Sequence, residues 1–220
     1  MGIIYYWINP AIELVALTIS LVCLNNKEGG WYRYFVGYLL IVVVVESFAN
    51  ILYFCWHQPN NHWLYNLYLP LQFSFMTWIL YRICKPHFNS KPLALSGLIV
   101  FVAIYCMESV RSHFMAYSSV TKTVFSCWTI VFCFLYYHKL LKEEKYININ
   151  KHVPFWIVTG IFFFYFVSTT SNLFFDYLVE MNKEQLRPIR YTIFLILNII
   201  LYGTWSYAFI CKYRQKPSVQ

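Results

Sequence analysis

Seven apolar stretches, each close to the length that a helix needs to cross a lipid bilayer, make up most of this 220-residue chain. About 20 mostly apolar residues are enough for one spanning helix. The connecting segments are too short to hold a soluble domain, so we expect any catalytic output domain to belong to another protein. The sequence therefore predicts an all-α polytopic membrane protein with seven transmembrane helices in a single domain over residues 1–220. The predicted spans are residues 7–25, 34–56, 62–84, 92–109, 119–138, 153–178 and 189–212.

The composition agrees with a membrane environment. Hydrophobic residues make up 60% of the chain and charged residues only 12%, whereas soluble domains carry about 25% charged residues. The segment from Met1 to Trp7 lacks the basic region and the small-residue cleavage site of a signal peptide. We therefore expect the first span to be retained in the protein.

The 17 basic residues predict an orientation, because cytoplasmic loops of membrane proteins carry an excess of Lys and Arg. The first, third and fifth loops and the C-terminal tail hold 12 of them, so we expect the N-terminus outside and the C-terminus in the cytoplasm. The net charge of +8 then reflects this orientation more than a polyanionic partner. We expect the basic loops to contact anionic lipid heads, and we expect no nucleic-acid partner. The five basic residues on the opposite side are Arg111, Lys122, Lys183, Arg187 and Arg190.

The second span carries a carboxylate near its middle. Glu46 directly follows four valines, and Asn50 comes about one helical turn later. An ionisable group at this depth costs roughly 2.5–3.5 kcal/mol on insertion scales and usually faces a protein interior. Tyr38, Val42, Glu46 and Asn50 repeat at the spacing of one helix face. The second span is therefore predicted to turn a polar stripe towards the other helices.

The first span carries a second carboxylate, Glu13, which lies roughly 10 Å below the outer end of the helix at about 1.5 Å per residue. Its neighbours on the same face include Ala16, Leu17 and Ser20. Small side chains let two helices approach closely in a membrane. This face of the first span is therefore predicted to pack against another helix.

Polar side chains in other spans also fall in the outer half of the bilayer or near its midplane, given this topology. The inner halves offer hydroxyl groups but no buried carboxylate or amide. A channel or carrier needs polar groups along its whole length, whereas an outward-facing cavity needs them only in its outer part. The pattern favours sensing over transport. The residues of the candidate polar pocket are Glu13, Glu46, Asn50, Asn66, Tyr68, Gln72, Thr169, Asn172, Asn198 and Tyr202.

Glu13 and Glu46 have three interpretations on the sequence alone. They can be protonated carboxyls of a packed core, bonded to Asn, Tyr or each other. They can recognise an amine or a proton that enters from the outer side, with the signal passed to a cytoplasmic or membrane partner protein. They can also form the relay of a small transporter or channel. A structural or membrane-disrupting oligomer is a further alternative, and the sequence predicts no oligomeric state.

Several familiar chemistries lack their residues. The last span has no lysine for a retinal Schiff base, and the six histidines lie at or beyond the predicted span ends, where they cannot hold a membrane haem. His57 and His62 in the second loop lack a third ligand, so we expect no metal site. The H-E-x-x-H, G-x-S-x-G and phosphate-loop motifs are absent. The sequence therefore predicts no catalytic residue and no cofactor.

Two local features of the third and fourth spans carry structural predictions. Pro70 removes a backbone donor in the third span, so we expect a bend there and a carbonyl free to meet other polar groups. Glu108, Arg111 and His113 follow the fourth span and are predicted to form a solvated rim.

Polar and aromatic runs recur in the third, sixth and seventh spans. They are residues 61–68 with 72–73, residues 154–157 with 160–163, and residues 198–202. Together these runs resemble the short seven-helix integral membrane proteins that recur in Bacteroidota genomes. The resemblance covers nearly the whole chain and implies the same topology, but that family has no assigned activity and so implies no site residue. We expect the bacterial inner (cytoplasmic) membrane as the location.

Overall fold

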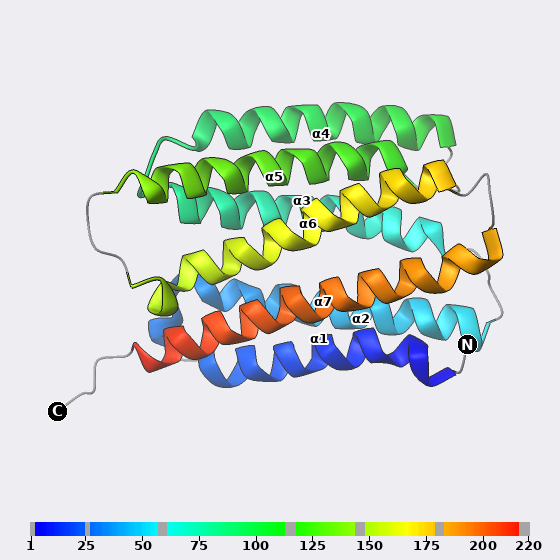
Figure 1. The fold of residues 1–220 in the computed structure, drawn as a ribbon, viewed down its shortest axis with the longest axis horizontal. Coiled ribbons are helices and arrows are strands. Elements are labelled where there is room, and N and C mark those ends of the chain that lie inside the picture. The colour runs from blue at the N-terminus through cyan, green and yellow to red at the C-terminus, as the bar shows by residue number, and fades with distance from the viewer. Residues whose placement is uncertain are drawn as a thin grey trace. The chain divides into compact units, whose positions relative to one another are not determined.

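The computed structural model of the chain describes residues 3–24, 27–56, 61–112, 118–143, 148–178 and 183–215. These residues form seven α-helices and two short 3₁₀ helices, coloured in chain order in Figure 1. The α-helices are α1 (Ile3–Leu24), α2 (Tyr34–Phe54), α3 (His62–Cys84), α4 (Lys91–Ser112), α5 (Ser119–Leu141), α6 (Val153–Leu178) and α7 (Lys183–Arg214). The 3₁₀ helices are η1 (Lys27–Arg33) and η2 (Ile149–Lys151).

Each predicted span overlaps one of these helices over most of its length, which confirms the all-helical fold class. Six of the helices in the described residues are long and apolar enough to cross a membrane, so the chain is an integral membrane protein. The exception is α3, whose 23 residues include Asn66, Gln72 and Arg82. A seventh span and the orientation of the bundle stay predictions.

The helices fall into two compact units. Residues 1–50 and 147–220 form the first, here called the terminal unit, and residues 51–146 form the second, here called the middle unit. The boundary falls inside α2, close to its C-terminal end. A single domain over residues 1–220 stays a prediction.

In the terminal unit, α7 packs against both α6 and α1 (Figure 1). Trp205 of α7 is fully buried, and its indole Nε1 donates a hydrogen bond to the Ile157 carbonyl of α6 at 3.3 Å. The ring of Phe35 from α2 meets the Trp205 ring edge-on at 5.0 Å between centroids. Aromatic pairs of this geometry add about 0.5–1.5 kcal/mol beyond the area that they bury. Trp205 thus joins three helices of the unit.

The contact between α6 and α7 depends on a residue without a side chain. A Cβ atom at Gly160 would lie 2.1 Å from Thr204 Oγ1 and 3.3 Å from the Leu201 carbonyl oxygen. Glycine lets the two backbones approach, as in other membrane helix pairs.

The middle unit is a bundle of α3, α4 and α5, in which each helix packs against the other two. Its core holds a cluster of three rings: Phe73 stacks on Phe101 at 4.0 Å between centroids and meets Phe125 edge-on at 5.1 Å. A glycine contact also joins α4 to α5, because a Cβ at Gly97 would lie 2.2 Å from Trp128 Nε1.

The helix α3 continues through Pro70 from His62 to Cys84. Proline has no N–H, so the carbonyl four residues earlier, that of Asn66, loses its helical partner. The Tyr105 hydroxyl of α4 donates a hydrogen bond to this carbonyl at 3.0 Å. The free carbonyl predicted from Pro70 therefore has a side-chain partner on the neighbouring helix.

Candidate functional site

Glu13 is the most deeply buried carboxylate among the described residues, with 2% of its surface exposed. Ala16, Leu17 and Ser20, which share its helix face, are buried as well. Because α1 packs against α7, this is the face that meets α7. The sequence prediction of a close-packed face with a carboxyl group in it is confirmed.

Side chains from α2 and α7 interact with this carboxyl group, and further tyrosines interact with the one from α7. The Tyr202 hydroxyl of α7 hydrogen bonds to Glu13, and Glu46 of α2 lies within electrostatic range of it. Tyr38 of α2 and Tyr165 of α6 lie within the same range of Tyr202. We call these five residues the carboxyl cluster. Two acids and three tyrosines thus meet inside one unit of a membrane protein.

Two tyrosines of the carboxyl cluster, Tyr38 and Tyr202, pack against Trp205. The Tyr202 ring lies 6.0 Å from the Trp205 ring and perpendicular to it, and the Tyr38 ring lies 6.2 Å from the same tryptophan. Tyr38, Tyr165 and Tyr202 are all buried. Packing against the Trp205 ring restricts where the Tyr38 and Tyr202 hydroxyl groups can point.

The carboxyl cluster is not saturated with hydrogen bonds. Glu13 Oε2 is buried, and it has no hydrogen-bond partner among the residues that the structure describes. The same holds for Asn9 Oδ1, one turn away on α1, and for Thr169 Oγ1, one turn from Tyr165 on α6. A buried polar atom without a partner costs about 1–3 kcal/mol. Such atoms are uncommon in native proteins, and they call for a ligand, a proton or water.

Three further candidates from the sequence also belong to the terminal unit. Asn50 of α2, Asn172 of α6 and Asn198 of α7 are half-buried, as is Glu46. Their place in a ligand pocket stays a prediction. Asn9, Tyr38 and Tyr165 were absent from the candidate pocket; the spacing of Tyr38 from Glu46 on α2 was the signal for one of them.

The remaining candidates, Asn66, Tyr68 and Gln72, lie on α3 in the middle unit. Asn66 is buried, and its Oδ1 accepts the Ser118 backbone N–H at 3.2 Å, just before α5 begins. This amide therefore ties two elements of the fold together. Tyr68 and Gln72 are half-buried on the same helix, and their role in a pocket stays a prediction.

Glu108 has a more specific role than the solvated rim predicted for it. Its Oε1 accepts the Val120 N–H at 3.2 Å, and its Oε2 accepts the Thr121 N–H at 2.9 Å and the Thr121 hydroxyl at 2.6 Å. The first N–H groups of a helix lack intrahelical partners and favour negative charge. Glu108 thus caps α5 from the end of α4. Of the other rim residues, Arg111 is exposed, and His113 lies outside the described residues.

Comparison of the chain with protein-family models, with curated proteins and with solved structures gave no match. The function is therefore argued from the residues of the carboxyl cluster alone.

Proposed function

We propose that this protein is a membrane-embedded ligand-binding module of the sensory type, in which the carboxyl cluster recognises a small amine or a proton. The observation that carries the proposal is the buried Glu13 carboxyl group, whose Oε2 has no partner among the described residues. Natural proteins rarely leave such a group in a core without a use, because an apolar residue there would cost less.

The chemistry of the carboxyl cluster suits a cation. A carboxylate away from water needs an opposite charge or a proton to offset the loss of its hydration. An ammonium group has three donors, and the Glu13 and Glu46 carboxyl groups with the Tyr202 hydroxyl offer acceptors for them. The buried Tyr38 and Tyr165 rings add faces that attract a cation by roughly 0.5–2 kcal/mol each.

A signal needs a path from the carboxyl cluster to a partner protein. The helix α7 supplies Tyr202 and continues to Lys212 and Arg214 in its last turn. With the orientation predicted from the basic residues, a ligand reaches Glu13 from the outer side and α7 ends in the cytoplasm. A shift of α7 on ligand binding would then transmit the signal to a cytoplasmic or membrane signalling partner. The resemblance to short seven-helix proteins of Bacteroidota supports the bacterial inner membrane as the location.

A small transporter is the second candidate. It is favoured by the electrostatic interaction between Glu13 and Glu46, since two carboxyl groups in range of each other can pass a proton or a cation. A flux of protons or amines into proteoliposomes that disappears in Glu13→Gln and Glu46→Gln would establish transport in place of sensing.

The deciding experiment measures thermal stability of the purified chain as a function of pH and of added amines. We expect a panel of small primary and quaternary amines to contain members that raise the melting temperature of the wild type. Glu46→Gln should weaken that binding at least about tenfold, because charge-assisted hydrogen bonds are worth about 1.5–3 kcal/mol. Glu46→Gln should also change how the melting temperature depends on pH.

Ser20→Ala is the matched control. Ser20 shares the buried face of α1, but its hydroxyl bonds to the Leu17 carbonyl of its own helix at 2.7 Å. This variant should keep both the amine response and the pH dependence. If Glu46→Gln folds normally and also keeps both, the carboxyl cluster is a packed core and the proposed function is wrong.

A further inference from the structure

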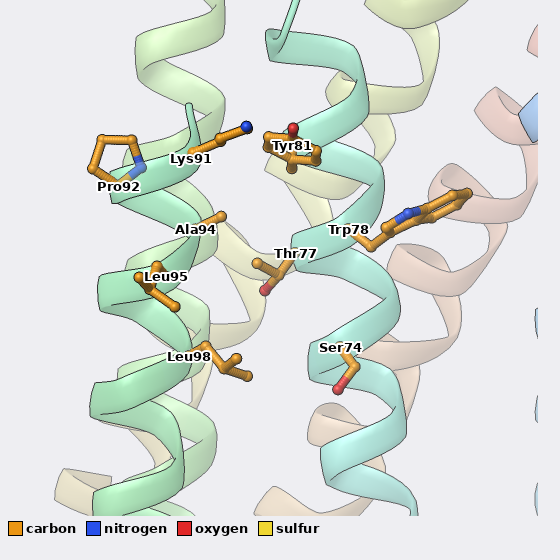
Figure 2. Close-up of a pocket in the computed structure, with 9 residues that line it drawn as sticks. All are labelled: Ser74, Thr77, Trp78, Tyr81, Lys91, Pro92, Ala94, Leu95 and Leu98. Carbon is orange, nitrogen blue, oxygen red and sulfur yellow. The ribbon is translucent and has the colours of Figure 1, made fainter. Parts of the chain in front are cut away.

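A groove with two chemically different ends runs between α3 and α4 in the middle unit. It has a volume of about 530 Å³, inside the range of about 300–1,000 Å³ that small-molecule pockets occupy. Figure 2 shows its lining from both helices, with Lys91 and Tyr81 at one end and Leu98 and Ser74 towards the other. The lining residues are those drawn in Figure 2.

The apolar part of the groove follows α4. Ala94, Leu95 and Leu98 lie at the spacing of one helix face and line the groove together with Thr77 from α3. Leu95 and Leu98 are exposed, with 59% and 41% of their surfaces accessible. In a membrane protein such an apolar face suits an acyl chain, because neither the side chains nor the chain has polar groups that would lose hydrogen bonds on contact.

The other end of the groove is aromatic and basic. Lys91, the first residue of α4, reaches across the groove towards Tyr81 in Figure 2. Trp78 of α3 also lines the groove, and the Arg82 guanidinium lies 5.6 Å from its ring centroid. Tryptophan and tyrosine gather at the level of the lipid headgroups in membrane proteins. Lys91 and Arg82 are both exposed, so their charges are available to a headgroup.

The same end of the middle unit is rich in positive charge. Lys85 lies in the turn between α3 and α4, and Lys139 and Lys142 lie where α5 ends. Glu143, an acidic side chain at this end, hydrogen bonds with His87 Nδ1. The start of α4 adds the positive end of its helix dipole beside Lys91. The hydroxyl of Ser90 bonds to the Tyr81 carbonyl at 3.3 Å, which fixes this helix start against α3.

From this arrangement we infer that the groove between α3 and α4 binds one anionic phospholipid, with its phosphate held by Lys91 at the aromatic end, where Arg82 lies over the Trp78 ring, and an acyl chain along Leu95 and Leu98. Charge complementarity selects an anionic over a zwitterionic lipid, and the apolar lining selects a lipid over a free phosphate. This proposal does not depend on which face of the membrane the Lys91 end of the groove lies at. It is independent of the carboxyl cluster in the terminal unit.

Native mass spectrometry of the full chain in detergent tests the proposal, with phosphatidylglycerol, phosphatidylcholine and glycerol phosphate as three separate probes. We expect one phosphatidylglycerol to bind in preference to phosphatidylcholine, and glycerol phosphate not to compete. Lys91→Gln should lower the affinity for phosphatidylglycerol about fivefold, and Lys91→Gln with Arg82→Gln about thirtyfold, because each basic residue near a lipid surface contributes on the order of 1 kcal/mol.

Two matched controls separate this site from a general effect of charge or bulk. Arg111→Gln removes an exposed charge from the other end of α4 and should leave the affinity unchanged. Leu98→Trp fills the groove and should abolish the lipid, whereas Ile99→Trp, at an exposed neighbour outside the groove, should not. Equal losses in Lys91→Gln and Arg111→Gln, no preference over phosphatidylcholine, or full binding in Leu98→Trp would each overturn the proposal.

Discussion

Two glutamates of this chain, Glu108 and Glu13, show how differently one side chain can be used in a helical membrane protein. Glu108 of the middle unit accepts three hydrogen bonds with both of its oxygens, from Val120 and Thr121. Glu13 of the terminal unit is almost completely buried, and its Oε2 has no partner among the described residues. Both carboxyl oxygens of the half-buried Glu108 accept hydrogen bonds, whereas one oxygen of the deeply buried Glu13 accepts none from the described residues.

Polar groups whose hydrogen bonds are made within the protein stabilise the fold. A buried polar atom without a partner does not, and it is a candidate for binding a ligand. A carboxylate with its bonds made to backbone N–H groups contributes to stability, because removing it leaves those donors unpaired. A buried carboxyl with an unused oxygen costs stability, and replacing it by an apolar side chain relieves that cost. Stability measurements on matched variants can therefore test the comparison directly.

The largest effect is expected at Glu108. Glu108→Ala should destabilise the protein by about 2 kcal/mol, at the upper end of the range for helix caps, because two N–H groups at the start of α5 lose their acceptor. Unfolding by a denaturant in mixed micelles measures this loss. Arg111→Ala is the control, since Arg111 is an exposed charge at the same end of α4. Equal stability of Glu108→Ala and wild type would mean that water replaces the cap.

The next effect is expected at Asn66, the amide that joins α3 to the start of α5. Asn66→Leu should cost about 1.5 kcal/mol, because the Ser118 N–H loses its acceptor in a buried position. The same unfolding experiment measures it. Ser126→Ala, on α5, is the comparison variant and should cost less than half as much, because the buried Ser126 hydroxyl bonds to the Lys122 carbonyl of its own helix. An equal or larger loss in Ser126→Ala would mean that the bond between Asn66 and Ser118 has no special structural role.

The helices could be predicted because a membrane imposes both their length and their apolar composition. The one large difference is the start of α7, at Lys183 where residue 189 was predicted. Charged residues at 183, 187 and 190 end the apolar stretch without ending the helix, because helix propensity does not depend on hydrophobicity. The pairing of α1 with α7 could not be predicted, since no sequence pattern links helices so far apart in the chain.

The polar residues could be found from the sequence, but their use could not. A carboxylate inside an apolar span stands out whether it is satisfied or not. The amide of Asn66 stands out in the same way as the carboxyl group of Glu13. Only the structure shows that the Ser118 N–H bonds to Asn66 Oδ1, whereas Glu13 Oε2 has no partner among the described residues. The sequence predicts a solvated rim for Glu108 because its partners, Val120 and Thr121, lie on the next helix and cannot be recognised from the residues around Glu108. Capping motifs that can be read from a sequence join residues a few positions apart, whereas this cap joins two helices across a loop.

Glu13 should respond in the opposite direction to Glu108. In Glu13→Met with Tyr202→Phe, both partners of this hydrogen bond become apolar groups of similar shape, so the bond is removed from both sides at once. We expect this double variant to be as stable as the wild type or more stable by about 1 kcal/mol. Unfolding in the absence of any amine measures it. A loss as large as that of Asn66→Leu would place Glu13 among the residues that hold the fold.

The smallest effect is expected at Thr169, whose buried hydroxyl has no partner among the described residues. Thr169→Val keeps the branched shape and removes only the hydroxyl, so it should change stability by less than about 0.5 kcal/mol. Thr129→Val is the matched control, because Thr129 is also buried, in the middle unit, and its hydroxyl bonds to the Phe125 carbonyl of its own helix. The two valine variants differ in function if the comparison is right: only Thr169→Val should alter the response of the melting temperature to amines. If Thr129→Val alters that response as much, the unpaired atoms of the terminal unit do not mark the ligand site.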